Sequence, residues 1–232
     1  MTNAGKRWIV KKQFEGLPKK EDFELIEESL QEIQDGEILV SALYLSVDPY
    51  MRPFTKGMTP PFSMIGEAVF QVMQSKDEQF PEGATITAKA GWLLCGVLKS
   101  KQMKQDDPNS IFLAPDIKNL SKSLLLGACG MPGNTAYFGF LNICQPKKGE
   151  TVVVNGAAGA VGSLVGQLAK LAGARVVAFA GSDDKCKYLT DDLGFDKAQW
   201  NVSRGFVSLV KTSADNVILP IFDIFTNGLS LF

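Results

Sequence analysis

The sequence contains no histidine at all. That absence excludes Ser-His-Asp and Cys-His catalysis, the HExxH zinc site and any imidazole proton shuttle. The four cysteines are widely spaced and form no Cys-x-x-Cys pair, which is typical of reduced thiols rather than of a disulfide framework or a metal site. We therefore expect no metal, and chemistry carried by a cofactor, a carboxylate, Tyr, Lys or the backbone. The cysteines are Cys95, Cys129, Cys144 and Cys186.

Charge and hydropathy exclude further classes of protein. The 232 residues carry a net charge of −1, so no broad attraction to nucleic acid or to an anionic membrane is expected. Apolar stretches end well short of the roughly 20 residues that span a bilayer, and the basic N-terminus lacks the apolar core of a signal peptide. A hydrophobic content of 45% is ordinary for one large or two smaller globular domains. We expect a cytoplasmic protein with no nucleic-acid or membrane partner.

The first half of the chain is predicted to be rich in strands. Short apolar and β-branched runs are separated by Gly, Pro and Asp turn signals, a pattern typical of a compact β-barrel-like unit. A polar segment, Lys104–Ser110, is expected to form a surface loop. The expected strands are Arg7–Lys11, Glu37–Leu45, Ile65–Met73 and Ala84–Ala90.

The pattern changes near Ser121. Met131–Gly133 is expected to break the chain before a helix over Thr135–Cys144. Strand, helix, strand and helix then follow within about 45 residues, which predicts a βαβ unit in a parallel sheet. Beyond Asp196 no firm periodicity is found, and the chain ends in an apolar tail. The four expected elements are Thr151–Asn155, Ala160–Ala172, Arg175–Ala180 and a helix that Ser182 caps and that runs toward Leu193.

A glycine-rich segment, Asn155–Ser163, lies between the first buried strand and its helix. Compared with Gly-x-Gly-x-x-Gly, it has Ala157 in the first glycine place, then Gly159 and Gly162. Gly159 permits close approach of a pyrophosphate, Gly162 permits tight helix–strand packing, and the helix N-terminus attracts the anion. The alternative is that these glycines serve only a tight turn. We favour dinucleotide binding, because the motif stands between a strand and a helix.

The end of the second strand favours NADPH over NADH. NAD-binding folds place a carboxylate near this tip for the ribose hydroxyls, but Phe179–Ser182 contains none. The small residues leave room for a 2′-phosphate, which Lys185 can reach. The other interpretation gives the ribose role to Asp183 and Asp184. We assign these two acids to the first helical turn instead, behind the Ser182 cap.

Four motifs in register resemble the prostaglandin reductase family of zinc-free medium-chain dehydrogenases/reductases over about residues 7 to 196. The resemblance implies an α/β fold with three parts. A GroES-like β-barrel domain (1–122) is followed by a partial doubly wound Rossmann domain that binds NADP (123–198) and by a divergent tail (199–232). The motifs are Ser46–Arg52, Gly130–Gly133 with Thr135–Gly139, Asn155–Ser163 and Gly181–Lys185.

The resemblance also implies a reaction. It is the NADPH-dependent reduction of the carbon–carbon double bond of α,β-unsaturated ketones and aldehydes, such as 15-oxo-prostaglandins and 2-alkenals, together with leukotriene B4 oxidation. Tyr50 is the candidate donor to the substrate oxygen, or a tyrosine packed beside Pro49. Thr135 touches the cofactor or caps a helix. The cofactor-binding residues implied are Thr135, Gly159, Ala160, Val161, Gly162, Ser182 and Lys185.

The sequence departs from the family after about residue 196. Gln199–Val202 lacks the tyrosine that contacts the cofactor in the family, and the rest of the chain has no family counterpart. We expect a C-terminally truncated or variant form. Two alternatives remain: an NADP-binding chain without turnover, or a quinone oxidoreductase of the same superfamily. Half a parallel sheet also leaves an edge strand that invites pairing with another chain, for example in a homodimer.

Overall fold

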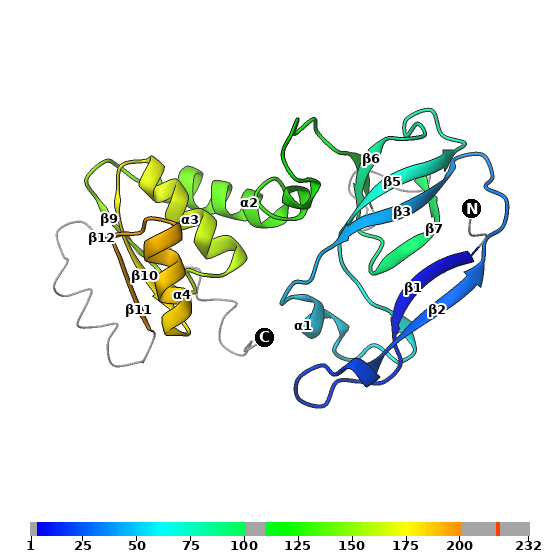
Figure 1. Ribbon diagram of the computed structural model, residues 1–232, viewed down its shortest axis with the longest axis horizontal. Coiled ribbons are helices and arrows are strands. Elements are labelled where there is room, and N and C mark those ends of the chain that lie inside the picture. The colour runs from blue at the N-terminus through cyan, green and yellow to red at the C-terminus, as the bar shows by residue number, and fades with distance from the viewer. Residues whose placement is uncertain (1–3, 101–109, 201–216, 219–232) are drawn as a thin grey trace. The chain divides into compact units, whose positions relative to one another are not determined.

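The computed structural model describes residues 4–100, 110–200 and 217–218. The chain divides between Leu126 and Gly127 into two compact units, and Figure 1 labels most of their helices and strands. Each unit is described by itself. Within the described ranges, no helix has both the length and the apolar character that a membrane crossing requires.

The first unit is built on an eight-stranded sheet of antiparallel pairs, in the order β2-β1-β7-β3-β5-β6-β8 with β4 on β1. Its helical segments are short: η1 (Lys20–Asp22), α1 (Met51–Thr55) and η3 (Lys122–Leu126). The strands are β1 (Ala4–Val10), β2 (Phe23–Ser29), β3 (Glu37–Leu45), β4 (Phe62–Ser63), β5 (Ala68–Ser75), β6 (Thr85–Ala88), β7 (Leu93–Lys99) and β8 (Ile111–Leu113).

All four strands predicted for this unit are present, as β1, β3, β5 and β6. β5 begins at Ala68 rather than Ile65, because Gly66 has a φ of +148° that interrupts the extended chain. Strands β2, β4, β7 and β8 were not predicted. β2 has acidic residues on both faces. Backbone pairing along its whole length holds it to β1, and the exposed pairs Lys6–Glu27 at 2.7 Å and Arg7–Glu28 at 2.9 Å also join the two strands.

The main core of the first unit lies on one face of this sheet. Residues i and i+2 of a strand share a face, and buried pairs at that spacing occur on β3 and β5: Ile38 with Val40, and Phe70 with Val72. A second, smaller cluster contains Val10, Met51 and Met64, against which Tyr50 and Trp92 pack. This second cluster fixes the loop that leads from β3 into α1.

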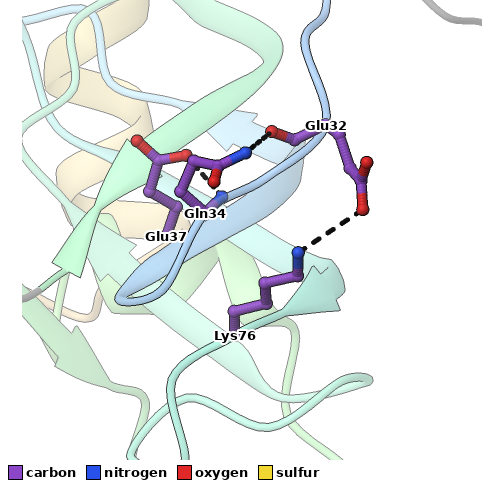
Figure 2. Close-up of polar contacts among 4 residues, drawn as sticks. All are labelled: Glu32, Gln34, Glu37 and Lys76. Carbon is purple, nitrogen blue, oxygen red and sulfur yellow. Dashed lines mark hydrogen bonds and ion pairs between the residues drawn. The ribbon is translucent and has the colours of Figure 1, made fainter.

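A polar network closes the turn between β2 and β3, as Figure 2 shows. Lys76 reaches Glu32 at 3.5 Å, and the side-chain amide of Gln34 donates to the Glu32 carbonyl at 2.9 Å. The Gln34 backbone N–H donates to Glu37 at 2.8 Å. The network is exposed, with 44% and 87% of the Lys76 and Glu32 side chains accessible. Such an ion pair contributes little to stability.

The second unit contains a parallel sheet in the order β11-β10-β9-β12, and Figure 1 shows α3 and α4 beside it. The strands are β9 (Thr151–Val154), β10 (Arg175–Ala180), β11 (Lys197–Trp200) and β12 (Val217–Ile218). The helices are α2 (Met131–Ala136), the π-helix η4 (Tyr137–Cys144), α3 (Ala160–Leu171), α4 (Asp183–Lys187) and the π-helix η5 (Tyr188–Asp192).

Strands β9 and β10 are buried on both faces. On one face Val152 and Val176 join a core with residues of η4 and α3, while Val153, Val177 and Phe179 form a separate cluster on the other. Because helices cover parallel sheets, such strands read as continuous apolar runs. The sequence therefore predicts these two strands correctly, and β10 within its observed bounds.

Two expectations for this region are wrong, the break at Met131–Gly133 and the absence of a regular element after Asp196. Pro132 lies in the first turn of α2 instead of breaking the chain, because the first turn of a helix tolerates a residue without an N–H. The predicted helix over Thr135–Cys144 is present as the end of α2 and the whole of η4, and it starts earlier, at Met131. A strand, β11, follows Asp196 where no pattern was found. One expectation for the first unit belongs here as well. Of the surface loop expected over Lys104–Ser110, only Ser110 lies within the described residues, and Ser110 is buried.

Asp196 joins three elements of the second unit at the start of β11. Its carboxylate accepts from the Lys170 ammonium on α3 at 2.9 Å to each oxygen. It also accepts from the Val176 N–H of β10 at 2.6 Å. Burial raises the pKa of this carboxyl, but the Val176 N–H and the Lys170 charge outweigh burial and hold the pKa below its usual range. Asp196 is therefore a structural clamp in its ionised form.

Candidate functional site

The turn from β9 into α3 has the backbone of an anion site. Gly159 is the N-cap of α3, with φ −80° and ψ 170°, and no side chain caps the helix. The first intrahelical bond runs from Ser163 N to Gly159 O at 3.0 Å. The amides of Ala160, Val161 and Gly162 precede that bond, in the turn whose N–H groups have no intrahelical acceptor. These amides and the helix dipole can hold a phosphate.

Two glycines of this turn are held by close backbone contacts. A Cβ on Gly162 would lie 2.5 Å from the Gly156 carbonyl oxygen and 2.9 Å from the Ala157 Cα. A Cβ on Gly159 would meet only the Gly156 oxygen, at 3.1 Å. Gly162 therefore allows the helix to pack on the turn. Gly159 and Ala160 are exposed, so a ligand can approach the backbone there.

The same turn is bonded to the end of the neighbouring strand. Ala157 N donates to the Phe179 carbonyl at 2.9 Å, and Gly156 has a left-handed φ of +58° that makes the tight bend possible. Ala157, which occupies the first glycine place of the motif, is fully buried. The motif and the tip of β10 are thus parts of one hydrogen-bonded unit.

The tip of β10 leads directly into α4. Ser182 is the N-cap of α4 and accepts from Lys185 N at 3.4 Å, which confirms the predicted cap. Asp183 and Asp184 stand in the first turn, as expected. The side chain of Lys185 is exposed on this turn. A Cβ on Gly181 would meet nothing within 4 Å, so the tip is open.

Thr135 and Tyr137 lie on the α2–η4 helix. The Thr135 hydroxyl donates to the Met131 carbonyl at 2.8 Å, so it satisfies its own helix, and Gly130 is the N-cap instead. The alternative that Thr135 caps a helix is wrong. Tyr137 is 50% exposed and meets Phe138 edge-on at 5.2 Å.

Tyr50 lies in the first unit, at the N-cap of α1. Its ring meets Phe54 edge-on, with the ring centroids 5.7 Å apart. Burial raises the pKa of the Tyr50 hydroxyl, as do the charges of Asp48 and Glu67, while a hydrogen bond with the Ser46 side chain lowers it. Arg52 donates to the Gly16 carbonyl; among the salt bridges of the described residues, none joins it to Asp48.

Glu67 is a functional candidate that the sequence did not indicate. Burial raises the pKa of its carboxyl, the Lys89 charge lowers it and the Asp48 charge raises it again. Glu67 precedes β5 and has no motif around it, so only the register of β3 with β5 brings it near Tyr50. We call Ser46, Asp48, Tyr50, Glu67 and Lys89 the Tyr50 cluster.

The predicted site residues lie in three places. Gly159–Gly162, which we call the nucleotide turn, lies in the second unit with Ser182 and Lys185 at the tip of β10. Thr135 lies on α2 of the same unit, and Tyr50 lies with its cluster in the first unit. No group of three or more His, Cys, Asp and Glu side chains suited to a metal ion is found among the residues described. Two structural parts are thus available, a backbone anion site and a half-buried phenol among carboxylates.

Comparison with known proteins identifies relatives of this chain. Residues 6–105 match the family described as the N-terminal domain of oxidoreductase. Prostaglandin reductase 1 of Bos taurus is 47% identical over 193 residues, which cover 83% of this chain and 56% of that protein. The NADP⁺-dependent 2-alkenal reductase of Nicotiana tabacum is 37% identical over 84% of this chain and 58% of its own. This chain thus spans a little over half the length of these relatives.

A solved structure supports the predicted fold class. CurA from Vibrio vulnificus in complex with NADPH superimposes with a TM-score of 0.74 and 33% identity, over 89% of this chain and 61% of that one. Together with the antiparallel and the parallel sheet, this likeness confirms a GroES-like unit followed by a partial Rossmann unit.

Proposed function

Since this chain is a homologue of the prostaglandin reductase 1 proteins and has the medium-chain dehydrogenase/reductase fold, we propose that it is an NADPH-dependent reductase of α,β-unsaturated ketones and aldehydes. The substrate class comes from the names of the relatives, which are prostaglandin and 2-alkenal reductases. The observation that carries the proposal is the uncapped first turn of α3 behind a buried parallel strand.

The nucleotide turn fits a dinucleotide. A side chain at Gly159 would stand over exposed backbone, and Gly162 has no room for one. We assign Gly159, Ala160, Val161 and Gly162 to the pyrophosphate, because their amides offer hydrogen bonds and a partial positive charge without a competing side chain. Bound NADPH would supply the hydride for the reduction.

The tip of β10 fits the adenosine end of the same cofactor. Lys185 offers an exposed ammonium for a 2′-phosphate. Ser182 accepts from its own helix, and its hydroxyl proton remains a donor to an anion. The competing assignment gives Asp183 and Asp184 to the ribose hydroxyls of NADH, so the preference between the two nucleotides tests it. Thr135 remains a proposed cofactor contact through its exposed helix face.

Tyr50 is the proposed donor to the substrate. When hydride reaches the β-carbon of an enone, negative charge builds on the carbonyl oxygen, and a preorganised hydrogen-bond donor lowers the energy of that state. A phenol whose pKa is raised stays protonated and therefore remains a donor at neutral pH. Its half-buried position also limits competition from water.

Binding and turnover should be measured separately. We expect the chain to quench or enhance NADPH fluorescence on binding, and to consume NADPH with a 15-oxo-prostaglandin or a 2-alkenal faster than with a quinone. Binding without consumption would support a non-catalytic nucleotide-binding protein, and faster consumption with a quinone would support a quinone oxidoreductase. Absence of any NADPH binding would overturn the proposal.

Several finer assignments belong to the same proposal. We assign residues 1–122 to the substrate domain, 123–198 to the nucleotide domain and 199–232 to a divergent tail. We further propose a cytoplasmic location and a lipid enone or enal as the substrate. A homodimer is proposed as the assembly, which size-exclusion chromatography with light scattering will test.

A further inference from the structure

Two residues at the end of β9, just before the nucleotide turn, can react with each other. Asn155 is followed by Gly156, and the only other asparagine of the sequence that precedes a glycine is Asn227, outside the described residues. The Gly156 backbone N–H donates to the Asn155 side-chain oxygen at 3.0 Å. The backbone nitrogen of residue 156 is therefore held at the side-chain amide of the preceding asparagine.

This arrangement is the starting geometry of intramolecular deamidation. The Gly156 nitrogen loses its proton to base and attacks Asn155 Cγ, the carbon that carries the hydrogen-bonded oxygen. A nitrogen–carbon bond forms, the bond from Cγ to the side-chain nitrogen breaks, and this nitrogen takes up a proton and leaves as ammonia. Water then opens the cyclic imide to aspartate or to isoaspartate. The reaction needs no oxidant or catalyst, because the reacting groups are already adjacent.

The local structure leaves this attack unobstructed. Residue 156 has no side chain to hinder the approach of its nitrogen, and glycine adopts its φ of +58° without strain. Gly156 is exposed and Asn155 is half-buried, so base and water can reach the pair. Asn119 offers a contrast, because it is exposed in a turn but precedes Leu120, whose side chain hinders the same attack.

Both products would disturb the turn that we assign to the pyrophosphate. The Gly156 carbonyl accepts from Gly159 N at 2.9 Å, and a Cβ on Gly162 would lie 2.5 Å from its oxygen. Isoaspartate lengthens the main chain by one carbon before Gly156, so this carbonyl and its contacts must move. Aspartate leaves the main chain intact but adds a negative charge, which repels a diphosphate bound at this turn.

We propose that Asn155 is a deamidation site whose products weaken NADPH binding, and that bound NADPH protects it. Protection is expected because a cofactor held by the amides of Gly159–Gly162 opposes the movement of the turn that ring closure requires. The effect on NADPH rests on the proposed function. The chemistry at Asn155 does not, because it follows from the geometry of the turn alone.

Ageing of the whole chain tests the site by mass. The protein is incubated in mildly alkaline buffer, folded and in guanidinium chloride, and its peptides are analysed by mass spectrometry with fragmentation that distinguishes isoaspartate from aspartate. The peptide that contains Asn155 should gain the mass difference between an amide and an acid at least as fast in the folded chain as in the unfolded one. Asn119 is the matched control in the same digest and should stay unchanged.

Two outcomes of the ageing experiment would overturn the proposal. One is conversion of Asn155 only in denaturant, which would mean that the fold prevents the attack. The other is conversion no faster than that of Asn119. Asn155→Gln adds a further check, because it places the amide one carbon farther from the Gly156 nitrogen and should make deamidation at this position far slower. Equal rates in this variant and the unaltered chain would also contradict the mechanism.

The affinity for NADPH gives the second readout. The aged chain should bind NADPH about tenfold or more weakly than the fresh chain, the effect of one lost hydrogen bond to a charged group. The aged Asn155→Gln protein should keep its starting affinity. Unchanged affinity after complete conversion, or conversion at the same rate with saturating NADPH, would overturn the proposed link to the cofactor. If the fresh chain binds no NADPH, the proposed function fails, while the mass measurement still decides whether Asn155 deamidates.

Discussion

Gly162→Ala is the sharpest test of the nucleotide turn. Replacement of a helical glycine by alanine usually stabilises a protein, and the structure predicts that at this position it destabilises. In a helix, replacement of Gly by Ala stabilises by up to about 1 kcal/mol. At Gly162 the new Cβ would lie 2.5 Å from the Gly156 carbonyl oxygen and 2.9 Å from the Ala157 Cα. Both are backbone atoms, so neither can rotate away as a side chain does.

The clash outweighs the gain in helix propensity. Ordinary contact begins near 3.4 Å, and the difference must be taken up by moving the turn or the helix. Overpacking of this kind costs about 1–3 kcal/mol. After a gain of about 1 kcal/mol in helix propensity, the net result is a loss of up to about 2 kcal/mol in the free energy of unfolding of the second unit. NADPH binding should also weaken, because the amides of the first turn move.

Hydrogen exchange with mass spectrometry measures the stability of each of the two units separately. The peptide that covers α3 reports on the second unit, and its exchange in increasing urea gives the change in stability. Gly181→Ala is the matched control, because its Cβ would meet nothing within 4 Å; its stability should stay within about 0.5 kcal/mol of the unaltered protein. A Gly162→Ala protein as stable as the control would refute the close-packing argument.

The other predictions concern charge. Asp196 has a lowered pKa, so the stability it contributes is complete above the unfolded pKa of about 3.9 and is lost as the pH falls through the folded pKa. Asp196→Asn should lower the free energy of unfolding by about 1–2 kcal/mol at pH 7. In urea unfolding, the variant should also lose most of the change in stability with pH between about pH 5 and pH 2, the range in which such groups titrate. Lys76→Ala breaks the exposed pair with Glu32 and should change the free energy of unfolding by less than about 0.5 kcal/mol. An equal loss of stability in Lys76→Ala and Asp196→Asn would contradict the distinction between an exposed ion pair and the partly buried Asp196. Lys185→Ala should reduce the preference for NADPH over NADH about tenfold, the effect of one charge-assisted bond; an unaltered ratio of dissociation constants would leave Lys185 without a role in specificity. Gly159→Asp should weaken NADPH binding at least about 100-fold by placing a carboxylate at the pyrophosphate position, and unchanged affinity in a fluorescence titration would reject the turn as the binding site.

The strands that the sequence predicted most closely are those buried on both faces. β9 and β10 are covered on both faces, so their residues form uninterrupted Val-rich runs that cannot be missed. The glycine motif is equally easy to recognise, because the spacing of its glycines predicts a local backbone conformation. Tertiary packing is not needed to recognise either feature.

Elements held by their partners were missed. β11 (Lys197–Trp200) pairs with β10 through its backbone, and a strand of four residues is too short for its alternation of polar and apolar residues to be recognised in the sequence. β2 is held to β1 by backbone pairing along its whole length, from Ala4↔Ser29 to Val10↔Phe23, and most of its side chains are polar or exposed. For the same reason the sequence named Tyr50 but not Glu67. The register of β3 with β5 brings Glu67 to Ser46, and no local pattern encodes a register.

One short bond in the second unit has a wider consequence. Since Ala157 N donates to the Phe179 carbonyl, the loop proposed to hold the diphosphate and the strand end proposed to select the 2′-phosphate cannot shift independently. In the proposed site, a ligand that moves one end would also move the other, so the free energies contributed by the two ends of a nucleotide would be coupled and would not add. Selectivity for the adenosine end would then depend partly on the loop proposed to hold the diphosphate.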